Sequence, residues 1–170
     1  MCIRDRFGAG TLNELHAQPM PGRKALLVIS NGRSTRANSY LSRTEEQLRM
    51  AGVETVLFDR VEANPLKSTV MAGGAMAREN GCDMIVALGG GSVMDAAKAI
   101  AVVASNGGDY WDYIPCGTGK GKAVAETPLP IVAITTTAGT GSETDAGCVI
   151  TNAETHEKTG FVHPLSLIHI

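Results

Sequence analysis

The fold is decided by the stretch Asp83-Met84-Ile85-Val86-Ala87-Leu88-Gly89-Gly90-Gly91-Ser92-Val93-Met94-Asp95-Ala96-Ala97-Lys98. An apolar run leads through three glycines into an alanine-rich segment whose residues are strong helix formers. This pattern predicts a buried strand over 83–88, a tight turn, and a helix over 93–105. A strand-to-helix junction of this kind presents free backbone N–H groups and the positive end of a helix dipole, and both attract a phosphate.

A second junction of similar character is Ile134-Thr135-Thr136-Thr137-Ala138-Gly139-Thr140-Gly141-Ser142-Glu143, which follows an apolar run over 130–134. Its hydroxyls and N–H groups can donate to phosphate or ribose oxygens, and its glycines allow close approach. Taken singly, each junction is also compatible with a tight turn that binds nothing. Two such turns in one domain favour a dinucleotide. No Gly-Lys-Ser/Thr follows the glycines, which argues against a nucleoside triphosphatase.

The rest of the chain alternates between strand and helix patterns. Apolar runs predict strands over 24–30 and 53–59 and a short strand over 149–151, whereas amphipathic segments predict helices over 39–50 and 66–80. The stretch 110–130 reads as a loop. This alternation predicts an α/β fold with a parallel, Rossmann-like sheet and flanking helices. Ligands of such sheets lie beyond the carboxyl ends of the strands, where Asn31 and both glycine-rich junctions are expected.

Composition restricts the possible partners. The 170 residues are 44% hydrophobic and 19% charged, with a net charge of −2, so bulk charge favours neither nucleic acid nor an anionic membrane surface. No apolar run approaches the roughly 20 residues that span a bilayer. The four cysteines form no CxxC pair and are interpreted as structural, reduced thiols. With no visible signal peptide, the expected location is the cytoplasm.

Both ends of the chain look foreign to a folded domain. Residues 1–6 show neither helical nor strand periodicity, and residues 166–170 stop without a cap or a turn. We therefore expect one dinucleotide-binding α/β domain over 7–165, taken from a longer protein, with non-native ends.

Asp95 and Lys98 share one face of the predicted helix, because they are three residues apart. One interpretation is a solvated ion pair on the surface. The other is that Asp95, in the first helical turn, points toward the ligand cleft. Spacing alone does not decide between them.

The two junctions together resemble the iron-containing (group III) alcohol dehydrogenases. The resemblance is carried by Gly89-Gly90-Gly91-Ser92-x-x-Asp95-x-Ala97-Lys98 joined to Thr136-Thr137-Ala138-Gly139-Thr140-Gly141-Ser142-Glu143, and it covers nearly all of residues 7–165. Supporting matches are Phe7-Gly8-x-Gly10, Asn64-Pro65, Asp109-Tyr110-Trp111-Asp112-Tyr113 and Phe161-Val162-His163-Pro164. It implies the N-terminal cofactor-binding domain of a two-domain enzyme.

The resemblance also implies which residues contact the cofactor. Those expected to do so are Asn31, Asn64, Gly90, Gly91, Ser92, Asp95, Thr136, Thr137, Thr140 and Lys158. Of these, Gly90, Gly91, Ser92 and Asp95 would line the pyrophosphate and nicotinamide side. Thr135 departs from the proline usual in the family, which implies a slightly less stiff loop.

Asn31 is a second departure, because relatives that use NAD often place an aspartate there to accept from the ribose 2′-hydroxyl. An amide does not repel a 2′-phosphate, and Arg33 or Ser34 could help to hold one. The expected cofactor is therefore NADP or NAD, with NADP(H) favoured.

The function that the resemblance implies is an NAD(P)-dependent oxidoreductase that interconverts an alcohol and an aldehyde or ketone. In the family, one Asp and three His of a helical domain hold Fe²⁺ or Zn²⁺, and none of those motifs is present here. The four histidines show no H-x-x-x-H spacing, so no metal site and no catalytic residue is expected within this chain. By family analogy, the intact enzyme is expected to act on small-molecule alcohols or aldehydes as a homo-oligomer, whereas these residues alone are expected to be inactive. Two alternatives remain: a nucleotide-binding module without catalysis, and a lyase resembling dehydroquinate synthase.

Overall fold

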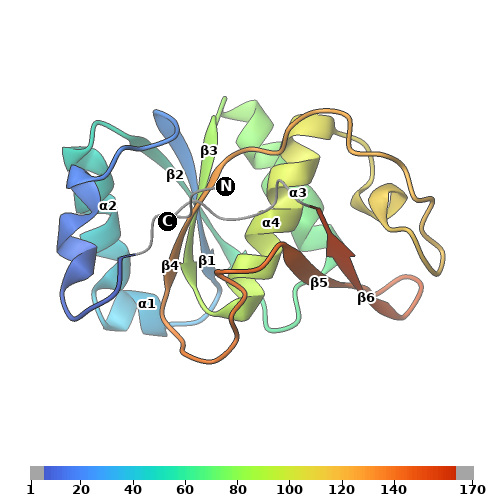
Figure 1. The fold of residues 1–170 in the computed structure, drawn as a ribbon. Helices are drawn as coiled ribbons and strands as arrows, with labels where there is room; N and C mark the ends of the chain where they lie inside the picture. The colour runs from blue at the N-terminus through green and yellow to red at the C-terminus, as the bar shows by residue number, and fades with distance from the viewer. Residues whose placement is uncertain (1–5, 164–170) are drawn as a thin grey trace.

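The computed structural model describes residues 6–163 and shows a parallel sheet at its centre (Figure 1). The four strands run in the order β2-β1-β3-β4, with Leu27 of β1 level with Leu57 on one side and Val86 on the other. The strands are β1 (Lys24–Ser30), β2 (Glu54–Val61), β3 (Met84–Gly89) and β4 (Ile131–Thr135). The predicted α/β class with a parallel, Rossmann-like sheet is therefore confirmed. All four carboxyl ends lie along one edge of this sheet.

Helices cover both faces of the sheet, as Figure 1 shows. Short helix α1 (Ser34–Ala37) and α2 (Tyr40–Met50) lie on one side, and α3 (Lys67–Glu79) and α4 (Gly91–Asn106) lie on the other. The predicted helices are thus present, with ends shifted by at most a few residues. Helix α4 begins two residues earlier than predicted, since the backbone becomes helical directly after Gly90.

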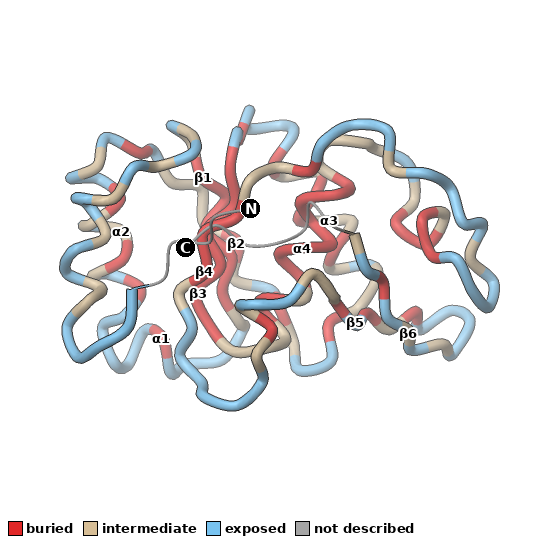
Figure 2. Tube along the Cα trace, viewed as in Figure 1, coloured by how far each residue is buried: buried red, intermediate tan, exposed pale blue. Residues whose placement is uncertain are grey.

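Two apolar cores result from the alternation of side chains along the strands. Leu27 and Ile29 of β1 pack with Leu41 and Leu48 of α2. The intervening residues of β1 belong to the larger core under α3 and α4. Figure 2 shows the buried residues concentrated in the sheet and in α4. The sheet therefore has no polar face, and both of its surfaces are buried.

A separate antiparallel hairpin follows the fourth strand. It consists of β5 (Gly147–Asn152) and β6 (Glu157–Val162). The predicted short strand over 149–151 is the centre of β5, but β6 was not predicted. Two 3-10 helices were also not predicted, η1 (Thr11–Ala17) and η2 (Tyr110–Tyr113), of which the second lies within the expected loop.

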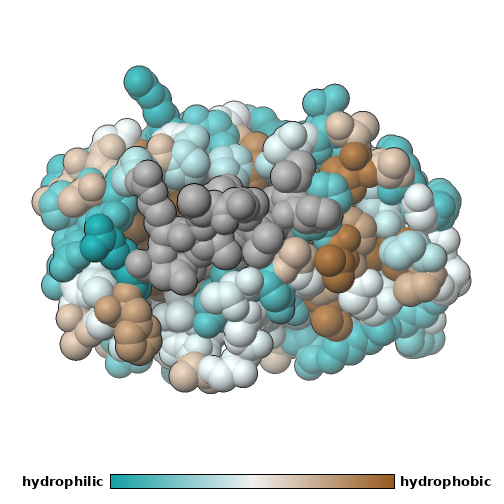
Figure 3. All heavy atoms as spheres, in the orientation of Figure 1, coloured by the Kyte–Doolittle hydropathy of each residue, from teal (hydrophilic) through white to brown (hydrophobic). Residues whose placement is uncertain are grey.

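On the face that Figure 3 shows, hydrophilic residues lie beside smaller groups of hydrophobic ones. Among the described residues, the large apolar side chains that remain exposed are Phe7, Tyr40, Met50, Val149 and Val162. Within residues 6–163, no helix combines the length and the hydropathy needed to cross a bilayer. The segments predicted to be foreign lie outside the described residues, apart from Arg6, which is exposed.

Helices α3 and α4 approach each other closely at two glycines. A Cβ atom at Gly74 would lie 2.8 Å from Cγ1 of Val103, and one at Gly73 would lie 2.5 Å from Cδ1 of Ile100. Both separations are shorter than ordinary van der Waals contact. The two helices can therefore pack this closely only because glycine has no side chain at these positions.

We expect Gly74→Ala to lower the free energy of unfolding. Overpacking a tight core costs about 1–3 kcal/mol, whereas alanine gains at most about 1 kcal/mol over glycine in a helix. Urea unfolding monitored by circular dichroism measures the difference, with Ser68→Ala on the exposed side of α3 as control. A variant as stable as the parent chain would contradict this account of the interface.

Candidate dinucleotide-binding site

The first glycine-rich turn connects β3 to α4. Gly90 is the N-cap in an extended conformation, and its carbonyl accepts from the N–H groups of Val93 (2.9 Å) and Met94 (3.1 Å). No side chain of the described residues caps this helix end. The N–H groups of Gly91 and Ser92 therefore lie at the positive end of a 16-residue helix, an arrangement suited to a phosphate.

The second turn follows β4 and is fixed to the end of β3. The N–H of Thr136 donates to the carbonyl of Gly89 at 2.9 Å. The hydroxyl of Thr135 donates to the carbonyl of Thr137 at 2.9 Å, so the residue that replaces the usual proline braces the turn by a hydrogen bond. Gly139 (φ +101°) and Gly141 (φ +67°) adopt left-handed conformations that favour glycine.

The two turns touch each other, as their shared position at the carboxyl edge predicts. A Cβ atom at Gly90 would overlap Oγ1 of Thr137. A Cβ atom at Gly91 would lie 3.2 Å from Cγ2 of Thr140. The structure therefore brings predicted residues of both motifs together, with hydroxyls on one side and a glycine-lined helix end on the other.

We expect Gly90→Ala to separate the two turns. The new methyl group would displace Thr137, and the threonine hydroxyls would no longer face the N-terminus of α4. Affinity for a nicotinamide dinucleotide, titrated as NADH and as NADPH, should then fall at least tenfold, which corresponds to about 1.4 kcal/mol. Isothermal titration calorimetry measures it. Unchanged affinity in a folded G90A chain would contradict the proposed role of the close approach.

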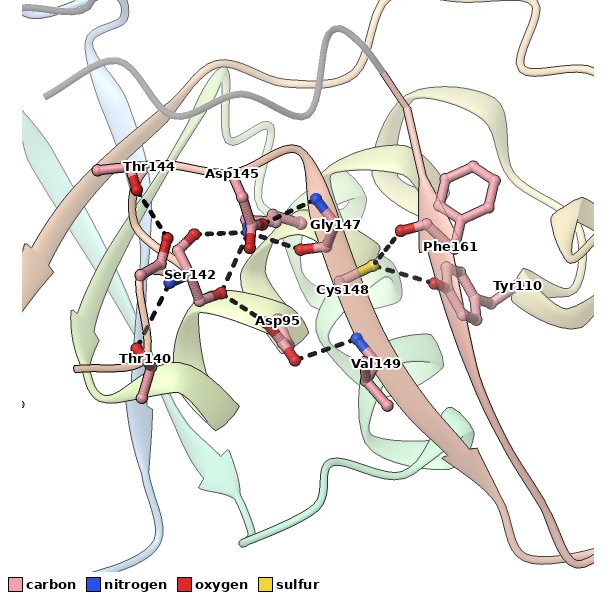
Figure 4. Close-up of polar contacts among 12 residues, drawn as sticks. Asp95, Tyr110, Thr140, Ser142, Thr144, Asp145, Gly147, Cys148, Val149 and Phe161 are labelled. Atoms are coloured by element: carbon pink, nitrogen blue, oxygen red, sulfur yellow. Dashed lines mark hydrogen bonds and ion pairs between the residues drawn. The ribbon is translucent and has the colours of Figure 1, made fainter.

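Asp95 connects the first helical turn to the segment after the second turn. Its Oδ1 accepts from Oγ of Ser142 at 2.6 Å, and its Oδ2 accepts from the N–H of Val149 at 3.0 Å (Figure 4). The solvated ion pair with Lys98 is wrong, because Lys98 is fully buried and forms its ion pair with Asp145 at 2.8 Å. The helix turns this face toward residues 142–149 and not toward solvent.

Asn64 and Lys158 meet at the end of the hairpin. Nζ of Lys158 donates to Oδ1 of Asn64 at 2.7 Å. Asn64 follows β2 with a left-handed φ of +56°, which asparagine tolerates better than most residues. The backbone N–H of Thr151 donates to the carbonyl of Pro65 at 2.9 Å and joins β5 to the same loop. Two predicted residues that are far apart in sequence are thus brought into contact.

Asn31 lies at the carboxyl end of β1, on the strand next to β3. Its N–H donates to the carbonyl of Val61 at 2.8 Å, and its side chain is exposed. Arg33 is exposed nearby in sequence, whereas Arg36 is paired with Asp59 at 2.7 Å. The exposed amide of Asn31 therefore lies at the carboxyl edge of the sheet, where a ligand would lie.

A hollow of about 1330 Å³ borders the second turn on the α2 side of the sheet. Thr136, Thr137 and Gly139 line it, together with Leu88 and Ile134. Glu143 also faces it, and its Oε2 has no hydrogen-bond partner among residues 6–163. The glycines of the first turn do not line this hollow. The second turn therefore faces the hollow on one side and contacts the N-terminus of α4 on the other.

The hairpin is held to the loop after η2 through Glu157. Its carboxylate accepts from the hydroxyl and the N–H of Thr118 and from the hydroxyl of Thr155 (2.6 Å). Nε1 of Trp111 donates to the same Thr118 hydroxyl at 3.0 Å. These hydrogen bonds, led by that from Thr118, lower the pKa of Glu157 from 4.5 to about 2.

The lowered pKa of Glu157 predicts a loss of stability in acid. The unfolded chain binds a proton at Glu157 more readily than the folded chain, so this contribution is complete above about pH 4.5 and disappears as the pH falls toward 2. Glu157→Gln should lower stability at neutral pH and flatten this acid limb. Urea unfolding across this pH range measures it, with exposed Glu14→Gln as control. An acid limb unchanged in E157Q would refute the assignment.

The part of the chain that the structure describes contains no grouping of three or more His, Cys, Asp or Glu that could hold a metal ion. Cys82 and Cys148 are buried, whereas Cys116 is exposed. Burial, the leading cause, raises the pKa of Cys148 to about 12, which keeps this thiol protonated. The described residues therefore provide no ligand set for the metal that the resemblance implies.

Comparison with known proteins decides the family. The family model described as iron-containing alcohol dehydrogenase matches residues 4–169. The chain belongs to this family. Within it, the chain is 42% identical to a 1,3-propanediol dehydrogenase of Klebsiella pneumoniae over 155 residues, which cover 89% of this chain and 38% of the relative. It is 39% identical to a probable NADH-dependent butanol dehydrogenase of Bacillus subtilis, covering 94% of this chain and 40% of the relative.

Solved structures of family members share the fold. An archaeal halo-thermophilic alcohol dehydrogenase from a Red Sea brine pool superimposes with a TM-score of 0.87 at 37% identity, covering 99% of this chain and 45% of that one. A sulfoacetaldehyde reductase from Bifidobacterium kashiwanohense in complex with NAD⁺ superimposes with a TM-score of 0.83 at 29% identity, covering 98% and 43%. The chain thus spans less than half the length of these relatives.

Some residues of the site escaped the sequence analysis. Ser142, Asp145 and Gly147 were not singled out, although they contact Asp95 or Lys98. The signal that could have found them is the charge of Lys98 within an otherwise apolar run, 96–103, since a buried cation requires acceptors.

Proposed function

We propose that this chain holds the nicotinamide dinucleotide of an alcohol dehydrogenase. The observation that carries the proposal is the contact between the uncapped N-terminus of α4 and the threonine-rich turn. A Cβ atom at Gly90 would overlap Thr137, and one at Gly91 would press on Thr140, so the contact requires glycine at both positions. Family members that use NADH, and one solved in complex with NAD⁺, support the same class of cofactor.

The proposed contacts follow the elements that carry them. The N–H groups of Gly91 and Ser92 would donate to the pyrophosphate. The missing side chain of Gly90 lets Thr137 approach this helix end. Thr136, Thr137 and Thr140 would donate hydroxyl or backbone hydrogens from the opposite side. The Asn64–Lys158 pair would close the site beside the hairpin. Asp95 is already bonded to Ser142 and Val149, so its contribution is to hold these elements in place.

For the intact enzyme, we propose interconversion of a small alcohol and its aldehyde or ketone. The bound cofactor supplies or accepts the hydride, and the residues of this chain bind and orient it. The names of the relatives, which include propanediol and butanol dehydrogenases, support this substrate class. The family assignment favours this reaction over that of a dehydroquinate-synthase-like lyase.

Within this proposal, NADP(H) is preferred over NAD(H). The exposed Asn31 carries no charge that would repel a 2′-phosphate, and Arg33 is exposed two residues later. Arg36 is less available, because Asp59 neutralises it. The NADH-dependent relatives make this preference the most informative part of the proposal to test.

We expect Asn31→Asp to weaken NADPH binding roughly tenfold, about 1.4 kcal/mol, while NADH binding stays equal or improves. The cause is repulsion between the new carboxylate and the 2′-phosphate. Calorimetric titration of both nucleotides measures it. Asn80→Asp, which adds the same charge after α3 at the opposite edge of the sheet, is the control.

Three outcomes distinguish the possibilities. Measurable binding of either nucleotide by the parent chain supports the dinucleotide site, and binding of neither overturns it. A parent chain that prefers NADH overturns the preference alone. NADPH-dependent reduction of butanal separates an active dehydrogenase from the second candidate, a nucleotide-binding module without turnover. It is assayed on the full-length gene product, because the residues described here are expected to be inactive by themselves.

A further inference from the structure

The ammonium group of Lys98 is enclosed by oxygen atoms in the interior. Its side chain is fully buried, and Nζ donates to the carbonyls of Ser142 (2.6 Å) and Gly147 (2.6 Å) and to Oδ1 of Asp145 (2.8 Å). A fourth acceptor, Oγ of Ser142, lies 3.1 Å away. Three N–H bonds thus serve four oxygens, and none is left for a ligand.

A buried lysine is expensive and calls for a reason. Removing an ammonium group from water costs several kcal/mol in real proteins, and only good partners offset it. An apolar residue at position 98 would avoid this desolvation cost, as it does at the neighbouring positions 99–103, which are all apolar and buried. Every oxygen that Lys98 contacts belongs to residues 142–147, which directly follow the second turn.

Asp95 binds the same segment from one turn earlier in α4. It accepts from Oγ of Ser142 and from the N–H of Val149, as Figure 4 shows. The ammonium group of Lys98 therefore holds the carbonyls of Ser142 and Gly147. The carboxylate of Asp95, on the same helix face, holds the Ser142 hydroxyl and the N–H of Val149, two residues further along. Ser142 is shared between them, because its hydroxyl donates to Asp95 and its two oxygens accept from Lys98.

We infer that Lys98 is a positioning residue for dinucleotide binding, which acts by fixing residues 142–147 and thereby holding the second turn against Gly90 and Gly91. This inference rests on the proposed function. The turn itself contains two left-handed glycines and is largely exposed, so its own contacts are few. Anchoring its C-terminal end to α4 reduces the conformational entropy lost when a ligand orders its threonines.

The test compares Lys98→Ala with Val103→Ala on the same helix. Val103 is also fully buried but packs against Gly74 at the far end of α4. We expect K98A to lose NADPH affinity at least tenfold and to speed amide hydrogen exchange selectively over 136–147. V103A should lower global stability without either effect. A folded K98A chain with parental affinity and parental exchange in this segment would overturn the inference.

Chemical rescue separates positioning from general destabilisation. Propylammonium matches the part of the lysine side chain that K98A removes. It should restore NADPH affinity and slow exchange over 136–147 in K98A, while propanol, which lacks the charge, and V103A, which lacks the matching cavity, show no rescue. Equal recovery with propanol would mean that the cavity matters and the charge does not, and would overturn the role of the ammonium group.

Asp145→Asn keeps the inference testable if K98A fails to fold. The Asp145 side chain is 58% exposed, so the substitution removes the charged partner with little disturbance of the core. Exchange over 142–147 should quicken and NADPH affinity should fall, with exposed Glu126→Gln, outside the site, as the control. D145N indistinguishable from E126Q would count against positioning. If the parent chain binds no nucleotide, the proposed function fails, while the exchange comparison still decides whether Lys98 fixes the turn.

Discussion

The burial of helix α4 is the constraint on which the rest of this structure depends. Ten of its sixteen residues are buried, and they contact the sheet, helix α3 and the hairpin. A helix fixed on so many sides has its N-terminus fixed as well. The uncapped N–H groups after Gly90 therefore occupy a definite position at the carboxyl edge of β3. Electrostatic attraction for a phosphate is useful only where the donors are held in place in this way.

Charged side chains of the described residues hold loops in place both in the interior and at the surface. Asp95 and Lys98 lie inside, where their partners are atoms of residues 142–149. Glu157 lies at the surface, where hydrogen bonds from threonine hydroxyls hold its carboxylate ionised. Both arrangements tie a loop to a regular element. Hydrogen bonds from polar side chains thus fix the positions of these loops, while the apolar residues form the two cores.

The sequence predicted the parallel sheet and its helices because their signals are local. Apolar runs and glycine-rich ends marked β3 and α4, and parallel strands place their carboxyl ends together. The hairpin strand β6 was missed, since Glu157, Lys158 and Gly160 have low strand propensity and gain it only by pairing with β5. Local spacing also left the partners of Lys98 undecided, because they belong to residues 142–147, which come much later in the chain. Contacts of this kind depend on tertiary packing, and no periodicity within α4 reveals them.

The chemistry of the Lys98 contacts has a consequence for how this loop can change. Two of its acceptors are backbone carbonyls, at Ser142 and Gly147, which every residue type provides. The intervening positions Glu143, Thr144 and Ala146 make no side-chain contact with the ammonium group in the described structure. The hydroxyl of Thr144 nevertheless supports the turn, because it donates to the carbonyl of Gly141 at 2.8 Å. Sequence variation in this segment, whether by descent or by engineering, can therefore be concentrated at Glu143 and Ala146 without removing a hydrogen bond to Lys98.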